Sequence, residues 1–176
     1  LLDNLGEAVQ RVRSGDTAAF QRIVAATSSK LVRLGARMLG NVSDAEDVVQ
    51  EAYVKAYRAL ISGEFDGRAN VTTWLYRIVT NQAIDAMRGR ARRPKPTDTA
   101  DESATDLASA EQHLALAELS DWMSELPPDQ RAALVLKAVE GLTSPEIAEI
   151  LQCSEGAVEQ RLVRARTALR RRSETQ

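Results

Sequence analysis

The sequence predicts an all-α protein with two small helical domains joined by a flexible acidic linker, the C-terminal domain being a helix-turn-helix. Three observations lead to this prediction. Apolar residues recur at helical spacing along most of the chain, and no sustained alternation of β-branched residues indicates a strand. The 176 residues also contain only nine glycines and five prolines, which favours long helices with few turns.

Two helices are expected before residue 40. The first ends at the break formed by residues 14–16, where Gly15 and its polar neighbours interrupt the apolar pattern. Asp16 is the expected N-cap of the second helix, which runs over residues 17–39. Gly40 is expected to end that helix, because glycine readily adopts the left-handed conformation that follows many helices.

Two further helices complete the predicted N-terminal domain. Ser43 at the N-cap and Glu46 three residues later form the pattern of a capping box, which predicts a third helix that runs to about residue 61. A polar loop with two glycines covers residues 62–70, and a fourth helix is expected over residues 71–90.

A change of composition marks the domain boundary. Pro94 and Pro96 stop the fourth helix, and the small, polar and acidic residues that follow are typical of a tether. We therefore expect one domain over residues 1–93, a flexible linker over 94–110 and a second domain over 111–176.

The second domain begins with two predicted helices. They cover about residues 111–124 and 129–140, with a proline pair at Pro127 and Pro128 between them. Gly141 is expected to end the second of these helices.

The last part of the chain has the pattern of a helix-turn-helix. Ser144 is the expected N-cap of a short helix that runs to residue 151, with Pro145 at its first position. A turn over residues 152–154 leads to a final helix over about 155–172, whose inward stripe is Val158, Leu162, Ala165 and Leu169. Its opposite face is polar and rich in arginine, which suits DNA reading or, alternatively, a solvated helix end with favourable charge.

The formal charge of −2 is the sum of unlike parts. Residues 1–96 contain 15 Lys/Arg against 10 Asp/Glu, and residues 131–176 contain 8 against 6. Residues 97–130 contain nine acids and no Lys or Arg. A basic surplus is typical of nucleic-acid binding, so we expect the outer parts to face nucleic acid and the middle segment to stay away from it.

Composition also excludes several classes of protein. One cysteine, Cys153, cannot form a disulfide framework, and one histidine, His113, makes a histidine-based metal centre or a Ser/His/Asp triad unexpected. No apolar run approaches the length of a membrane span. We therefore expect a cytoplasmic protein with no membrane insertion, no metal, no cofactor and no catalytic residues.

Two helices of the N-terminal domain carry contrasting polar faces. The fourth ends in a cluster of cations from Arg88 to Lys95, and Trp74, Tyr76 and Asn81 precede that cluster. Aromatic, amide and basic groups beside a loop are what a protein needs to hold a single strand, although a lone tryptophan in an apolar stripe is more often a core residue. The third helix has an acidic face, which suits a basic protein partner or is simply solvated.

Four spaced motifs of this chain resemble those of bacterial extracytoplasmic-function (ECF) sigma factors. They read D-A-E-D-x-x-Q-E over residues 44–51, W-L-Y-R-I-x-x-N-x-x-x-D over 74–85, L-P-x-x-x-R over 126–131 and E-G-L-x-x-x-E-I-A over 140–148. The resemblance covers most of the chain in the right order. It implies two promoter-reading domains, called regions two and four, with only a linker between them.

The resemblance also implies roles for individual residues. Asp47, Gln50 and Glu51 match the face that binds the clamp coiled coil of the largest subunit of core RNA polymerase. Contacts to the minus-10 element, including capture of a flipped base, are carried over to Phe65, Asn70, Trp74, Arg77, Asn81 and Arg88. The minus-35 element is expected to meet Glu155, Glu159, Gln160, Val163, Arg164 and Arg166.

Two features of the chain qualify the resemblance. Glu159 and Gln160 stand where the family often has a small or basic residue, so they could read cytosine and adenine, or Glu159 could only orient Arg166 or Arg170. The acidic linker could mimic RNA in a basic polymerase channel. In that case neutralising its acids would weaken polymerase binding or alter early transcript release.

The resemblance also implies a further partner, since the family usually has an anti-sigma factor that covers the polymerase-binding surfaces.

Two other functions remain open at this point. A helix-turn-helix regulator whose N-terminal helices only dimerise would lack the two motifs of residues 44–57 and 65–88. A helical hydrolase with a carboxylate metal site on the third helix is disfavoured, because no histidine accompanies those acids.

Overall fold

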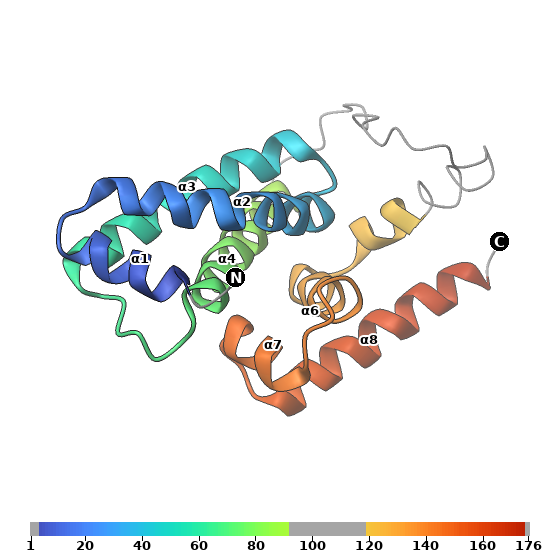
Figure 1. Cartoon of the computed structure of the whole chain (residues 1–176). Helices are drawn as coiled ribbons and strands as arrows, with labels where there is room; N and C mark the ends of the chain where they lie inside the picture. Colours follow the sequence, from blue (N-terminus) through green and yellow to red (C-terminus); the bar gives the residue numbers. More distant parts are fainter. Residues whose placement is uncertain (1–3, 92–118, 175–176) are drawn as a thin grey trace.

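The computed structural model describes residues 4–91 and 119–174, which form helices and connecting turns without any strand (Figure 1). This confirms the predicted all-α fold. A short helix over residues 119–125 precedes α6. The other helices are α1 (Asn4–Arg13), α2 (Thr17–Leu39), α3 (Val42–Ser62), α4 (Val71–Ala91), α6 (Pro128–Ala138), α7 (Ser144–Leu151) and α8 (Glu155–Ser173).

Helices α1, α3 and α4 pack around α2, which contacts each of them. Their shared core consists of side chains with almost no exposed surface: Val12, Ile23, Leu31, Leu34, Met38, Leu60, Leu75 and Val79. Helices α2 and α3 approach closely at Gly35, where a Cβ would lie 3.0 Å from the Cβ of Ala45. This glycine therefore permits the helix crossing that presents the outer face of α3.

The helix ends agree with the sequence prediction at two sites and correct it at two others. Asp16 caps α2, since its side chain accepts a hydrogen bond from the backbone N–H of Ala19, and Gly40 follows α2 in the left-handed conformation. The predicted N-cap at Ser43 is wrong. Helix α3 starts two residues earlier because Asn41 accepts the hydrogen bond from the N–H of Asp44.

The second correction lies at the start of α7. Thr143, rather than Ser144, is its N-cap, and the carboxylate of Glu146 accepts hydrogen bonds from the backbone N–H and hydroxyl of Thr143. These hydrogen bonds lower the pKa of Glu146. The prediction misplaced this cap by one residue because both positions carry a hydroxyl side chain that can cap a helix.

Helices α7 and α8 form the predicted helix-turn-helix. Gln152 adopts the left-handed conformation with φ of 49°, and Ser154 caps α8 by accepting a hydrogen bond from the N–H of Ala157. The inward stripe is confirmed for Val158, Leu162 and Ala165, which are at most 1% exposed, whereas Leu169 is only half-buried.

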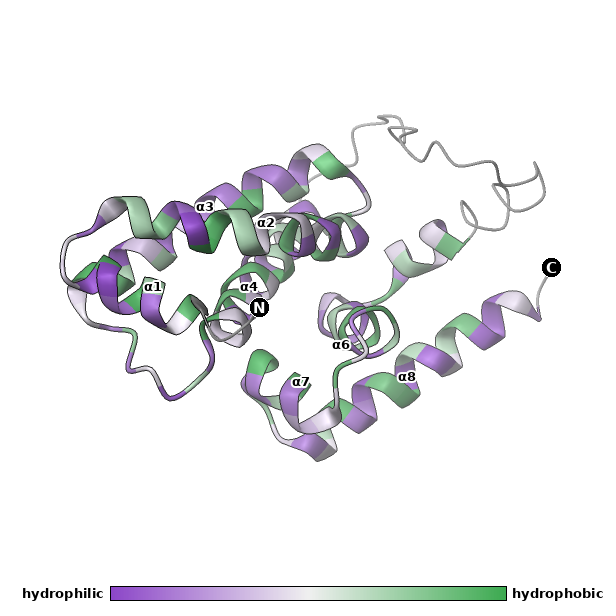
Figure 2. Cartoon of the chain, in the orientation of Figure 1, coloured by the Kyte–Doolittle hydropathy of each residue, from purple (hydrophilic) through white to green (hydrophobic). Residues whose placement is uncertain are grey.

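The two groups of helices contact each other. Helix α4 packs against α6 and α7, and α2 also packs against α6. All three of α4, α6 and α7 carry hydrophobic residues, coloured green in Figure 2, and the buried residues of both groups form one continuous cluster. The predicted acidic linker, the basic residues from Arg92 to Lys95 and His113 lie outside the described residues.

Candidate nucleic-acid interface

One face of α4 carries three of the six residues expected to contact the minus-10 element. Arg77, Asn81 and Arg88 follow one another at spacings of four and seven, which places them on the same side of a helix. Asn81 and Arg88 are exposed and Arg77 is half-buried. Asn70 has a structural role, since its side chain caps α4 by accepting a hydrogen bond from the N–H of Thr72 at 2.8 Å.

The two predicted aromatic contacts, Phe65 and Trp74, are buried against each other. Their exposed fractions are 6% and 7%, and their ring centroids lie 4.6 Å apart. Phe65 is held in place by its backbone N–H, which donates to the carbonyl of Ala59. The pair therefore joins the loop before α4 to the helix and acts as part of the core, as the apolar stripe of α4 suggests for Trp74.

A pocket of about 260 Å³ opens beside this aromatic pair. The loop before α4 and the first turns of α4 form most of its wall, and Glu149 of α7 closes one side; its lining residues are Glu64, Phe65, Asp66, Arg68, Ala69, Trp74, Arg77 and Glu149. Aromatic rings and guanidinium groups are the groups on which bases stack and with which they pair. The pocket thus brings together three of the six residues expected to contact the minus-10 element.

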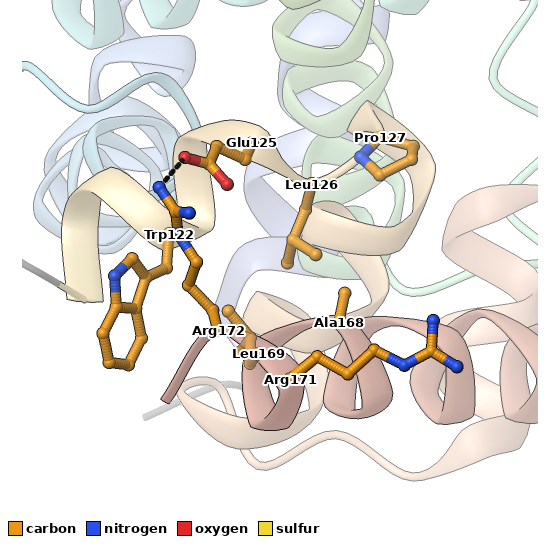
Figure 3. A pocket seen from close by; sticks show the side chains of 8 residues that line it. All are labelled: Trp122, Glu125, Leu126, Pro127, Ala168, Leu169, Arg171 and Arg172. Carbon is orange, nitrogen blue, oxygen red and sulfur yellow. Dashed lines mark hydrogen bonds and ion pairs between the residues drawn. The ribbon is translucent and has the colours of Figure 1, made fainter. Parts of the chain in front are cut away.

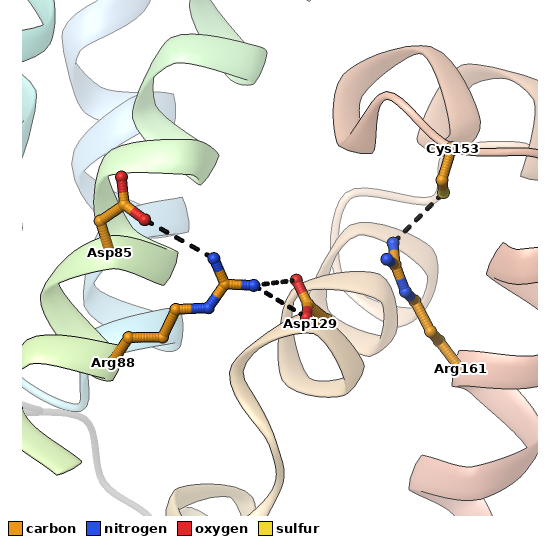
Figure 4. A network of polar contacts seen from close by, with 5 residues as sticks. All are labelled: Asp85, Arg88, Asp129, Cys153 and Arg161. Atoms are coloured by element: carbon orange, nitrogen blue, oxygen red, sulfur yellow. Dashed lines mark hydrogen bonds and ion pairs between the residues drawn. The ribbon is translucent and has the colours of Figure 1, made fainter. Parts of the chain in front are cut away.

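Two side chains on α4 are bound to carboxylates of the C-terminal part of the chain. Arg88 donates two hydrogen bonds to Asp129 of α6, at 3.0 and 3.2 Å, and also lies 3.7 Å from Asp85 (Figure 4). The hydroxyl of Tyr76 donates to Glu140 at 2.8 Å. Burial, followed by this carboxylate, raises the pKa of Tyr76 far above its ordinary value.

Sequence reasoning left the role of Tyr76 open and missed both carboxylates. Asp129 and Glu140 lie more than forty residues from their partners along the chain. No local sequence pattern predicts such a pairing, because helical periodicity shows which side of one helix is apolar and not which distant residue that helix contacts.

The outer face of α3 is the second candidate surface. Asp47, Gln50 and Glu51 are all exposed, and their spacing places them on one side of the helix. Glu51 accepts a hydrogen bond from Gln82 of α4 at 3.2 Å. Val54 and Ile61 continue at intervals of seven from Asp47 and are 50% and 55% exposed. An acidic surface extended by apolar side chains fits a protein partner better than DNA.

The third candidate surface is the outer face of α8. All six residues expected to contact the minus-35 element are exposed on α8, outside the buried stripe: Glu155, Glu159, Gln160, Val163, Arg164 and Arg166. Val163 is 59% exposed, which leaves it available to an apolar group such as a thymine methyl. Polar and basic groups on one free helix face are what major-groove reading requires.

Glu159 has a partner within the protein. Its carboxylate accepts a hydrogen bond from the hydroxyl of Ser144, at the start of α7. In the part of the chain that the structure describes, no ion pair joins Glu159 to Arg166 or Arg170. The idea that Glu159 only orients those arginines therefore finds no support.

Other polar groups of the C-terminal helices stabilise the fold. Cys153 is half-buried in the turn, and its sulfur accepts a hydrogen bond from Arg161 at 3.2 Å (Figure 4). At the far end of α8, Arg172 pairs with Glu125 at 2.8 Å. This pair borders a second pocket of about 300 Å³, into which the side chain of Leu126 projects (Figure 3).

Residues 4–91 and 119–174 contain neither a metal-binding cluster nor a helix that could span a membrane. No group of three or more His, Cys, Asp or Glu side chains is arranged to hold a metal ion there. None of the helices in those ranges combines the length and apolar character needed to cross a membrane.

Fold and surfaces together define a transcription factor with two helical units, one of which carries a helix-turn-helix with a free basic face. Two family models match it: the model described as Sigma-70 region 2 over residues 23–93, and the model described as Sigma-70, region 4 over residues 109–169. The chain belongs to the sigma-70 family, in its ECF group, whose members are transcription initiation factors.

Relatives and solved structures agree with this placement. The RNA polymerase sigma-H factor of Pseudomonas aeruginosa is 38% identical, covering 92% of this chain and 89% of the relative. The ECF RNA polymerase sigma-E factor of Escherichia coli K12 is also 38% identical, covering 92% and 90%. A structure of CnrH in complex with the cytosolic domain of CnrY is 28% identical, with a TM-score of 0.70 and 96% of each chain covered. The fold also resembles RpoE of Bartonella quintana, at 23% identity and a TM-score of 0.62 over 86% of this chain and 94% of that one.

Proposed function

We propose that this chain directs core RNA polymerase to promoters by using three separate surfaces, without catalysing a reaction itself. The outer face of α3, with Asp47, Gln50 and Glu51, binds the clamp coiled coil of the largest polymerase subunit. The loop before α4 and the face of α4 bind the minus-10 element. The outer face of α8 reads the minus-35 element. In this proposal residues 1–93 and 111–176 are the two functional domains, and 94–110 is their linker.

The observation that carries the proposal is the position of charge on the helices. The acidic face of α3 repels DNA and suits a basic protein surface, whereas the faces of α4 and α8 offer arginines and amides to nucleic acid. A dimerising regulator would have no use for an acidic surface of this kind beside a second DNA-binding face.

An anti-sigma factor is the further partner that we propose. The similar protein CnrH was solved in complex with the cytosolic domain of CnrY, and RpoE of Bartonella quintana with the anti-sigma factor NepR. The exposed valine and isoleucine on α3 extend its acidic face and provide apolar surface for such a partner.

Binding to core polymerase tests the proposed role of α3. The double variant Asp47→Asn/Glu51→Gln should bind core polymerase at least tenfold more weakly than the wild type, since desolvated charge pairs at interfaces each contribute on the order of 1.5 kcal/mol or more. A matched double variant, Asp121→Asn/Glu7→Gln, removes two exposed acids elsewhere and should bind normally. If the wild type fails to bind core polymerase at all, the proposal is wrong and a regulator becomes the better interpretation.

A further inference from the structure

Gln82 of α4 is buried behind the face of α3 that is proposed to bind core polymerase. It is 9% exposed, in the region where α3 and α4 pack against each other. Its side-chain amide donates a hydrogen bond from Nε2 to the carboxylate of Glu51 at 3.2 Å. The preceding residue, Asn81, is exposed and is proposed to contact the minus-10 element; consecutive residues lie about 100° apart around a helix. Gln82 therefore faces α3 rather than the proposed path of DNA.

Glu51 is the member of the outer face of α3 whose side chain this contact restrains. Within the part of the chain that the structure describes, the side chains of Asp47 and Gln50 make no hydrogen bond or ion pair. An exposed glutamate has several rotatable bonds and samples many rotamers, so a donor fixed in the core limits its freedom. The hydrogen bond uses Oε2 of Glu51, which leaves Oε1 available to a cation of a partner.

Gln82 is not the side chain that would best stabilise the core at this position. Its other polar atom, Oε1, is buried and has no hydrogen-bond partner among the described residues. A buried acceptor without a partner is unfavourable, and an apolar side chain of similar shape would avoid that penalty. The reverse orientation of the amide would set Oε1 against a carboxylate, so the donor must face Glu51. The contact with Glu51 therefore explains Gln82 better than packing does.

We propose that Gln82 is a positioning residue for the binding of core polymerase. Its buried amide holds the carboxylate of Glu51 in the orientation that meets a cation on the basic surface of the polymerase. The inference rests on the proposed role of α3 and adds a residue from α4 that does not itself touch the polymerase. Gln82 falls on an unspecified position of the motif W-L-Y-R-I-x-x-N-x-x-x-D, so the resemblance to the family assigns it no role.

The size of the expected effect follows from the ordering of one side chain. Immobilising a flexible side chain at an interface lowers affinity by a factor of about two to ten. Because Gln82 restrains Glu51 before the polymerase binds, the wild type avoids most of this loss. We therefore expect removal of the amide to weaken polymerase binding about fivefold, and removal of the carboxylate of Glu51 to weaken it about tenfold or more.

The test is a double-mutant cycle in the full chain, with core polymerase as the partner. Gln82→Met removes the amide and keeps an unbranched side chain of similar length, Glu51→Ala removes the carboxylate, and a third variant carries both changes. Thr80→Val is the matched control, because Thr80 is a fully buried residue of the same helix whose hydroxyl has no hydrogen-bond partner among the described residues. Fluorescence anisotropy of the chain labelled at its N-terminus measures polymerase binding, and urea unfolding measures stability.

The inference predicts that Gln82→Met separates polymerase binding from stability. This variant should bind core polymerase about fivefold more weakly than the wild type, while its urea midpoint is unchanged or higher. In the Glu51→Ala background the same change should leave affinity unaltered, and Thr80→Val should bind normally. A merely structural role of Gln82 would instead lower the urea midpoint and weaken binding equally in both backgrounds.

Two results would overturn the inference while leaving the proposed role of α3 intact. One is normal polymerase binding by Gln82→Met when Glu51→Ala binds weakly. The other is an equal loss of affinity from Gln82→Met with and without the carboxylate of Glu51. Failure of the proposed function gives a different result: if Glu51→Ala binds core polymerase as tightly as the wild type, the assignment of Glu51 to the polymerase is wrong, and the positioning role of Gln82 is wrong with it.

Discussion

Trp74 should contribute mainly to the stability of the N-terminal helices, and replacing it separates its structural role from any contact with DNA. Its side chain is 7% exposed and packs on Phe65 with ring centroids 4.6 Å apart. The change Trp74→Ala removes the indole and leaves Phe65, which anchors the loop before α4, without its main partner.

The expected cost can be estimated from this packing. Replacement of a buried aromatic residue by alanine costs about 3–5 kcal/mol, and an aromatic pair contributes about 0.5–1.5 kcal/mol beyond burial. Trp74 borders an open pocket that water can fill, so we expect the lower part of the range, about 3 kcal/mol. Trp74→Phe retains a ring against Phe65 and should cost about 1 kcal/mol.

Urea unfolding followed by circular dichroism measures both free energies. The expected result is a lower midpoint for Trp74→Ala, with a smaller shift for Trp74→Phe and normal promoter opening by the latter. If Trp74→Ala lost less than about 1 kcal/mol of stability but no longer opened promoters, Trp74 would be primarily a DNA contact, and the reasoning from burial would be refuted.

Three further changes test other parts of the structure. Gly35→Ala should destabilise the chain by about 1–2 kcal/mol in urea unfolding, because crowding against Ala45 outweighs the gain of about 1 kcal/mol in helix propensity. Adding Ala45→Gly should restore most of this loss, and a more stable single variant would disprove the close crossing of α2 and α3. Ser144→Ala should release Glu159 and change minus-35 base preference, measured by selection from a random library, with about 1 kcal/mol or less lost in stability; an unaltered preference would show that this hydrogen bond does not position Glu159. Asn81→Ala should reduce promoter opening, seen by permanganate footprinting, more than polymerase binding, and an equal loss of both would instead indicate a folding defect.

The helical fold was predictable from local pattern, and the exceptions have local causes. Helix α2 begins and ends where the sequence predicts, because Asp16 and Gly40 are unambiguous signals in their positions. The starts of α3 and α7 were misplaced because neighbouring residues, such as Asn41 and Ser43, are equally good caps. Side-chain chemistry alone cannot choose between them, since backbone geometry decides which one faces the free N–H.

The candidate surfaces were less predictable than the helices. The sequence predicts the outer face of α8, because apolar residues at helical spacing identify its buried side and therefore its exposed side. The pairing of Arg88 with Asp129 and of Tyr76 with Glu140 joins segments far apart in sequence, and it depends on how two helical units pack. Periodicity within one helix contains no information on such contacts.

Selection of promoters from a random DNA library, with core polymerase and the full chain, tests the central claim most directly. If the chain is a sigma factor that reads DNA with two separate domains, the transcribed sequences should share two short elements at a constant spacing upstream of the start site. Transcripts that depend on no common sequence, or binding of the chain alone to a palindromic site, would contradict this account.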